Sequence, residues 1–224
     1  MRLFEHPSPR VKVCGITSEA DALMCANAGA DALGFNFYSG SKRYIDPSTS
    51  LRWIANLKGA ADRVAVVVNA SPNLVKELWD SGCFEMIQFH GDETPLQCES
   101  LGVSRWMKAV RARDAATLSH SLQFSAPQVL LDAWSPAGYG GTGEVADWGL
   151  IRDFIANSPS LQYVLAGGLT PLNVAQAIEK VHPWAVDVAG GVESSPGIKD
   201  TALVKAFISE AKKYRLEQKE KPRC

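Results

Sequence analysis

Eight short apolar runs alternate along the chain with longer segments of helical pattern, and this alternation limits the fold more than any other feature. Strands that alternate with helices form a mainly parallel sheet. The runs recur at intervals of about 20 to 30 residues, which favours a closed eight-stranded barrel over an open doubly wound sheet. The first predicted turn also lacks the GxGxxG of a dinucleotide-binding fold. The sequence therefore predicts an α/β fold, a (βα)8 TIM barrel, with strands at Val11–Cys14, Ala32–Phe37, Val64–Asn69, Glu85–His90, Trp106–Arg111, Val129–Asp132, Tyr163–Ala166 and Ala185–Ala189.

Several predicted helices begin with the same device, a capping side chain followed by proline at the first helical position. The pairs are Asp46-Pro47, Ser71-Pro72, Thr94-Pro95 and Thr170-Pro171. The last helix has an apolar face and then a charged tail that we expect to fray into solvent. No linker or low-complexity block divides the chain. We expect one barrel domain over residues 1–224, with 1–10 and 215–224 as short flanking segments.

Composition excludes several classes of function. The 224 residues are 46% hydrophobic and carry a net charge of -1, so the chain can bury a large core but has no global attraction for nucleic acid or an anionic membrane. The N-terminus lacks the apolar core of a signal peptide, and no later stretch is apolar enough to span a bilayer. The five cysteines form no CxxC pair and the four histidines show no metal-ligand spacing. We expect a cytoplasmic protein with reduced thiols and no metal.

Two glycine pairs near the C-terminus predict an anion site. Gly167-Gly168 and Gly190-Gly191 each follow a short apolar run directly, and each precedes a predicted helix start. Glycine lets the backbone approach a ligand closely, and the first amides of a helix attract an anion. A single pair would more often be an ordinary turn. Two in succession suit the phosphate site that the last two βα loops of a barrel form.

Active-site groups of such a barrel come from the carboxyl ends of its strands. Polar side chains at the predicted ends are Cys14, Asn36, His90, Asp132 and Asp187. A free cysteine is often only a small buried hydrophobe. Lys12, two residues before Cys14, shares its face of the strand, and its ammonium can favour a thiolate, which makes Cys14 a candidate proton acceptor.

Asp132 closes the apolar strand VLLD, where a carboxylate is either a paired structural anion or a working acid. Desolvation raises a carboxyl pKa, so Asp132 could stay protonated and donate its proton. His90 is more often a satisfied rim histidine than a ligand. His90 and Asp187 are nevertheless candidate substrate-binding residues.

Two loops carry further candidates. Arg43, in the loop YSGSKRYI after the second strand, could bind a carboxylate through two hydrogen bonds, or could be a solvated loop charge. The glycine-rich segment SPAGYGGTG, residues 135–143, could close over the site as a lid or be a plain long loop.

Six ordered motifs give the chain a resemblance to a known family. KVCGIT, GFNFYSGSKRYI, QFHGDE, LLDAW followed by GGTG, LAGGLTPLNV, and DVAGGVE followed by PGIKD resemble the motif set of phosphoribosylanthranilate isomerase, a (βα)8 enzyme of tryptophan biosynthesis. The resemblance covers about residues 11–200. It implies an Amadori rearrangement of N-(5-phosphoribosyl)anthranilate to 1-(2-carboxyphenylamino)-1-deoxyribulose 5-phosphate, with no cofactor. We expect a monomer or a homodimer.

The resemblance also assigns roles to residues of this chain. Asp132 would protonate the ribose ring oxygen, and Cys14 would take the proton from the sugar C2. Arg43 would meet the anthranilate carboxylate. Backbone amides around the two glycine pairs would hold the phosphate.

Of three departures from the family motifs, the one in DVAGGVE bears on the expected phosphate site, and two alternative functions also stay open. DVAGGVE has Ala189-Gly190 where many family members have a serine pair, which removes hydroxyls near the expected phosphate. The related isomerase of histidine biosynthesis uses a pair of aspartates at the first and sixth strand ends, and Cys14 argues against it. A catalytically silent sugar-phosphate-binding barrel is the other alternative, and turnover would separate it from an enzyme.

Overall fold

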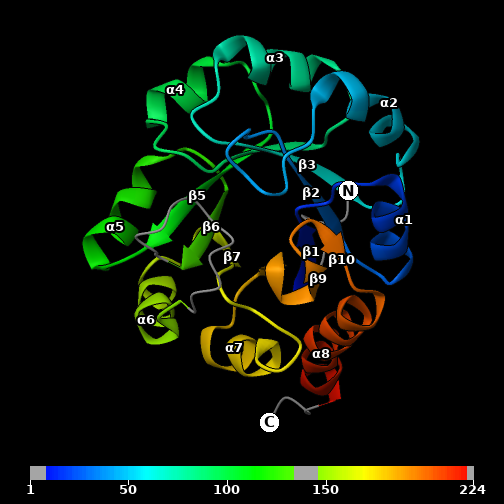
Figure 1. The fold of residues 1–224 in the computed structure, drawn as a ribbon. Helices are drawn as coiled ribbons and strands as arrows, with labels where there is room; N and C mark the ends of the chain where they lie inside the picture. Colours follow the sequence, from blue (N-terminus) through cyan, green and yellow to red (C-terminus); the bar gives the residue numbers. More distant parts are fainter. Residues whose placement is uncertain (1–8, 134–145, 221–224) are drawn as a thin grey trace.

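A closed eight-stranded parallel barrel forms the centre of the computed structural model, which describes residues 9–133 and 146–220, with side chains of the last helix through residue 213. The strands pair in chain order, and β1 closes the barrel against β8. Helices surround the barrel as an outer ring (Figure 1). The strands are β1 Arg10–Cys14, β2 Ala32–Asn36, β3 Asp62–Val67, β4 Met86–Phe89, β5 Trp106–Ala112, β6 Gln128–Ala133, β7 Gln162–Leu165 and β8 Ala185–Val188. The predicted TIM barrel is confirmed.

The helices follow the strands in alternation. They are α1 Glu19–Asn27, α2 Pro47–Asn56, α3 Pro72–Asp80, α4 Pro95–Ser100, α5 Ala115–His120, α6 Trp148–Asn157, α7 Val174–Val181 and α8 Thr201–Glu220, with short 3-10 helices η1 Ser121–Gln123 and η2 Gly190–Val192. Three of the four predicted proline starts are confirmed, because Asp46, Ser71 and Thr94 each accept a hydrogen bond from a first-turn amide. These caps satisfy amides that the helix itself leaves unpaired.

The fourth predicted helix start is wrong. α7 begins at Val174, after a turn over residues 171–173. The Asn173 side chain explains the delay, because its oxygen accepts the Thr170 amide at 2.8 Å while its nitrogen donates to the Gly168 carbonyl at 3.0 Å. Asn173 therefore holds the first glycine turn closed before the helix starts.

Two other segments also differ from the sequence prediction. No long helix follows Gly190-Gly191 directly. These glycines open η2, and an antiparallel hairpin of β9 Glu193–Ser195 and β10 Ile198–Lys199 precedes α8. The charged tail is helical through Glu220, the last residue of α8.

Side chains inside the barrel and those outside it form two apolar clusters. The outer cluster packs strands against helices and includes Val11, Val13, Phe207 and Ile208. The interior cluster consists of small and medium side chains, namely Ala32, Val64, Met86, Met107, Ala109, Leu130, Val164, Ala166 and Ala185. Because side chains alternate along a strand, this division fixes which residues point into the barrel at the strand ends.

Candidate active site

Alternation along the strands brings the predicted polar side chains to one face of the barrel. Leu130 and Ala185 belong to the interior cluster, and two residues later their strands carry Asp132 and Asp187. On β1 the outward residues are Val11 and Val13, so Cys14 also points inward. The carboxyl ends of β1, β6 and β8 thus present these three groups to a common mouth.

Cys14 stands beside a buried ion pair. Lys12 Nζ donates to Asp187 Oδ1 at 2.8 Å, and the strand register places these two residues opposite one another. The Lys12 side chain is fully buried. Gly34 on β2 makes room for the group, since a Cβ there would lie 2.7 Å from Cys14 Sγ and 3.1 Å from Lys12 Nζ.

The protonation of Cys14 differs from the sequence expectation. Desolvation is the largest influence and raises the pKa of the thiol, and the Asp187 carboxylate also raises it. Lys12 lowers the pKa as expected, but the net direction is upward. Burial lowers the pKa of Lys12 itself, yet Asp187 and Cys14 more than offset this, so the pKa of Lys12 is raised and its ammonium is retained.

Asp132 lies in a chain of hydrogen bonds with two β4 side chains. The Gln88 amide nitrogen is 2.9 Å from His90 Nδ1, and His90 Nε2 is 3.2 Å from Asp132 Oδ2. With the amide in this orientation, Nδ1 accepts and the ring hydrogen lies on Nε2, directed at Asp132. The other carboxylate oxygen accepts the Ala133 amide at 2.9 Å. His90 therefore contacts the candidate acid, and its ring orientation is fixed by Gln88.

Arg43 reaches the same mouth but is already paired. Its Nε and Nη2 donate to the two oxygens of Glu193 at 2.8 and 2.7 Å. Glu193 also accepts from Lys199, whose side chain is fully buried. Sequence reasoning missed Glu193 and Lys199 as site residues, although both lie in the motif segments DVAGGVE and PGIKD.

The two glycine turns meet, as the sequence predicts. Gly167 and Gly168 have φ of 87° and 62°, a region that favours glycine. A Cβ on Gly191 would lie 1.9 Å from the Leu169 carbonyl oxygen, so the second turn presses against the first. A Cβ on Gly167 would lie 2.4 Å from the Ala133 amide nitrogen, directly after Asp132. The glycine pairs therefore form one rim that reaches from β8 across β7 to the candidate acid.

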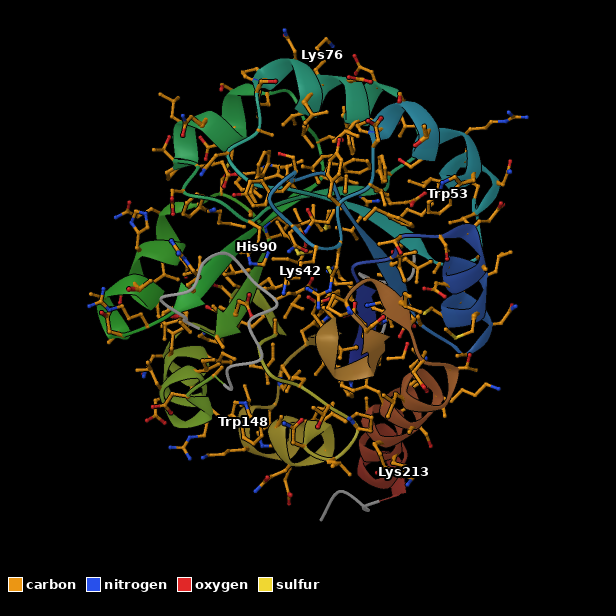
Figure 2. The ribbon with its side chains drawn as sticks, in the orientation of Figure 1. Lys42, Trp53, Lys76, His90, Trp148 and Lys213 are labelled. Carbon is orange, nitrogen blue, oxygen red and sulfur yellow. The ribbon has the colours of Figure 1, made fainter. Side chains whose placement is uncertain are left out.

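The side chains labelled in Figure 2 lie in two places, near the mouth of the barrel and on the outer surface. His90 and Lys42 lie within the ring of helices in the view of Figure 2, whereas Lys76 and Lys213 lie on its outside. The lid predicted at residues 135–143 falls outside the described residues. Within the described ranges, no three or more His, Cys, Asp or Glu side chains gather where they could hold a metal ion. No described helix is long and apolar enough to cross a membrane.

Comparison with known proteins identifies the family. A family model described as N-(5'-phosphoribosyl)anthranilate (PRA) isomerase matches residues 11–210. The chain belongs to the phosphoribosylanthranilate isomerase family. A relative of that name from Citrifermentans bemidjiense is 47% identical over 207 residues, which cover 92% of this chain and 98% of the relative. One from Geobacter sp. is 46% identical, with coverage of 91% and 98%.

Solved structures of phosphoribosylanthranilate isomerases agree with this barrel. The enzyme from Thermotoga maritima superposes with a TM-score of 0.83 at 39% identity, covering 92% of this chain and all of that one. Another isomerase structure, in complex with reduced 1-(o-carboxyphenylamino)-1-deoxyribulose 5-phosphate, has a TM-score of 0.79 at 36% identity, with coverage of 92% and 100%. The chain is an aldose–ketose isomerase of tryptophan biosynthesis. Family membership thus favours the phosphoribosylanthranilate substrate over that of the related histidine-pathway isomerase.

Proposed function

We propose that Asp132 and Cys14 are the acid and base of the phosphoribosylanthranilate isomerase reaction. Asp132 donates its proton to the ribose ring oxygen, the C1–O bond breaks, and the nitrogen lone pair forms a Schiff base. Cys14 as thiolate removes the C2 proton, and the electrons neutralise the nitrogen as an enolamine, which tautomerises to the ketone. The arrangement of Cys14 and Asp132, both pointing inward at strand ends, carries this proposal. One acid and one base suffice for such a shift, so we expect no metal and no cofactor.

Binding groups surround these two residues in the proposal. Amides at Gly167, Gly168, Gly190 and Gly191 hold the phosphate, supported by the contact of the two turns. Arg43 meets the anthranilate carboxylate. His90 orients Asp132 and lines the substrate side of it, and Asp187 acts through its ion pair with Lys12.

The setting of the enzyme follows from the same proposal. Its partner is a phosphorylated small molecule, and it acts in the cytoplasm as one domain over residues 1–224. We expect a monomer or a homodimer. The Thermotoga maritima isomerase, at 36% identity, is described as dimeric and has been made as monomers.

Substitution of Cys14 by alanine tests the base. We expect kcat to fall by about 10³-fold or more while KM changes little, because a proton-transfer group is lost and binding groups remain.

Since burial raises the pKa of this thiol, kcat/KM of the unaltered protein should rise from about pH 7 to about pH 9 as the thiolate fraction grows. Turnover is measured as loss of substrate fluorescence with phosphoribosylanthranilate made in situ. Cys83→Ala is the matched control, because Cys83 is buried before β4 and its thiol contacts the Leu51 carbonyl. A near-normal kcat in Cys14→Ala would remove Cys14 from the mechanism.

A further inference from the structure

Glu193 and Lys199 form a buried charged pair that the reaction itself does not require. Their side chains are 4% and 0% exposed, and they stand 2.7 Å apart. Burial alone raises the pKa of Glu193, but Arg43 and Lys199 outweigh it, so the pKa is lowered and the carboxylate is ionised. Burying charges in this way is unfavourable unless their partners are fixed. The contacts that Glu193 and Lys199 make with neighbouring groups therefore indicate the role of the pair.

The hairpin of β9 and β10 holds this pair against the base. Its register sets Lys199 opposite Glu193. Lys199 Nζ also donates to the Cys14 carbonyl at 2.6 Å and to the Ala189 carbonyl at 3.3 Å, so one ammonium ties the ends of β1 and β8 together. Figure 1 shows the orange hairpin beside the blue end of β1. Thr17 fastens the hairpin tip by donating to the Gly197 carbonyl at 2.6 Å.

Glu193 in turn fixes one edge of the Arg43 guanidinium. The carboxylate takes hydrogens from Nε and Nη2. A guanidinium has five N–H groups, so the edge formed by Nη1 and the second Nη2 hydrogen is left for another planar anion. The Arg43 side chain is 14% exposed and the Glu193 side chain is 4% exposed, so the arginine is the member of the pair that faces solvent. The arginine stem passes over Gly15, where a Cβ would lie 2.3 Å from Arg43 Cδ.

The net charge of Arg43, Glu193 and Lys199 also suits an anionic ligand. Arg43 and Lys199 supply two positive charges and Glu193 one negative charge, which leaves one positive charge at the rim next to Cys14. Lys12 and Asp187 beside them are balanced. The surplus charge therefore lies on the partly exposed arginine, where it attracts an anion through a local field.

We propose that Glu193, held by Lys199, is the positioning residue that aims the terminal edge of Arg43 at the substrate carboxylate. This rests on the proposed function, in which Arg43 binds that carboxylate. Glu193 acts through Arg43 and does not touch the substrate. Substrate specificity for an anthranilate, as opposed to an uncharged arylamine, then depends on a residue of the β9–β10 hairpin.

The test compares Glu193→Gln with the unaltered enzyme on two substrates, N-(5'-phosphoribosyl)anthranilate and its aniline analogue, which lacks the carboxylate. We expect KM for the anthranilate substrate to rise about tenfold with kcat within about twofold, because a ground-state contact is weakened. KM for the aniline analogue should not change. Glu193→Asp, which keeps the charge on a shorter stem, should give an intermediate KM and serves as a second variant if glutamine prevents folding.

A matched control exists at the opposite end of the barrel. Arg63, near the start of β3, donates from Nε and Nη2 to the two oxygens of Glu85 at 3.1 and 2.7 Å, the same fork as in Arg43 and Glu193. Glu85→Gln should alter stability without changing KM for either substrate. If Glu193→Gln shifts both substrates equally, or shifts neither, Glu193 is not the positioning residue.

Arg43→Ala keeps the two proposals distinguishable. If this variant raises KM for the anthranilate substrate alone while Glu193→Gln does not, the positioning role fails and the carboxylate site stands. If Arg43→Ala leaves the ratio of the two KM values unchanged, the carboxylate role of Arg43 fails, and the positioning proposal fails with it.

Discussion

The two sides of the barrel mouth are built differently. At the ends of β1 and β8, five charged side chains form two linked groups, Lys12 with Asp187 and Arg43 with Glu193 and Lys199. At the ends of β4 and β6, Asp132 has only a histidine and a backbone amide as its hydrogen-bond partners among the described residues. On the first side the charged groups are cross-linked around Cys14. On the other, Asp132 is held by one histidine and one backbone amide, and the buried ion pair of Lys108 with Glu93 joins β5 to the loop after β4.

This difference fits two tasks. Charges that are paired and buried keep their geometry, so the β1–β8 side is suited to fixing anionic parts of a substrate. A carboxyl with few partners can gain and lose a proton with little rearrangement around it, which suits an acid. The contrast predicts that substitution of Asp132 changes turnover, whereas on the β1–β8 side substitution of the ion-paired residues, as opposed to Cys14 itself, changes stability or binding.

The largest effect on the β4–β6 side should come from Asp132→Asn. The amide keeps the shape of the side chain but cannot deliver the proton, so kcat should fall by about 10²- to 10⁴-fold with little change in KM. Steady-state kinetics on the in situ substrate measures this. Asp62→Asn is the control, because Asp62 is also a buried aspartate but begins β3 at the far end of the barrel. A wild-type rate in Asp132→Asn would show that the acid lies elsewhere.

Lys12→Met probes the ionic scaffold on the β1–β8 side. It leaves the Asp187 carboxylate buried without its ammonium, which should lower the free energy of unfolding by about 3–5 kcal/mol in urea titration. The double variant Lys12→Met with Asp187→Asn should recover part of the loss, because no unpaired charge remains. A double variant less stable than Lys12→Met would contradict this account.

The stability that Lys12 contributes depends on pH in one direction only. The pKa of Lys12 is raised in the folded protein, so its contribution is complete below the unfolded value of about 10.4 and is lost as the pH rises through the folded pKa. The difference between Lys12→Met and the unaltered protein should therefore be constant from about pH 6 to about pH 9. Lys76→Met, which removes an exposed helix pair with Asp80, should change stability by about 0.5 kcal/mol or less.

The barrel and its strand ends could be predicted from the sequence because both depend on local pattern. Apolar runs at a regular spacing specify the strands, and alternation specifies that Cys14, His90, Asp132 and Asp187 end on the inner face. The meeting of the two glycine turns was also predictable, because positive φ at Gly167 and Gly168 and the close approach at Gly191 both call for glycine.

What sequence reasoning missed depends on distance and on competing energies. Arg43 and Glu193 are 150 positions apart, so nothing local indicates that they pair. The hairpin strands that present Glu193 and Lys199 are three and two residues long, too short for a periodic signal. For Cys14 the nearby ammonium was inferred correctly, but only the full environment shows that desolvation outweighs it.

Gly190→Ser is the mildest test of how rigid the ionic side is. It adds a hydroxyl at a position where the family resemblance leads us to expect serine, but its Cβ would lie 3.2 Å from Arg43 Nη2, which Glu193 holds at 2.7 Å. The Arg43 guanidinium must shift by a few tenths of an ångström to accommodate this Cβ. Because the shift weakens its contact with the substrate, KM should rise by about threefold or less with kcat unchanged. In a Glu193→Gln background the arginine can move, and adding Gly190→Ser should cause no further rise. A fall in KM for Gly190→Ser alone would mean that the new hydroxyl binds the phosphate more strongly than it disturbs Arg43, and that the β1–β8 side is less rigid than its ion pairs imply.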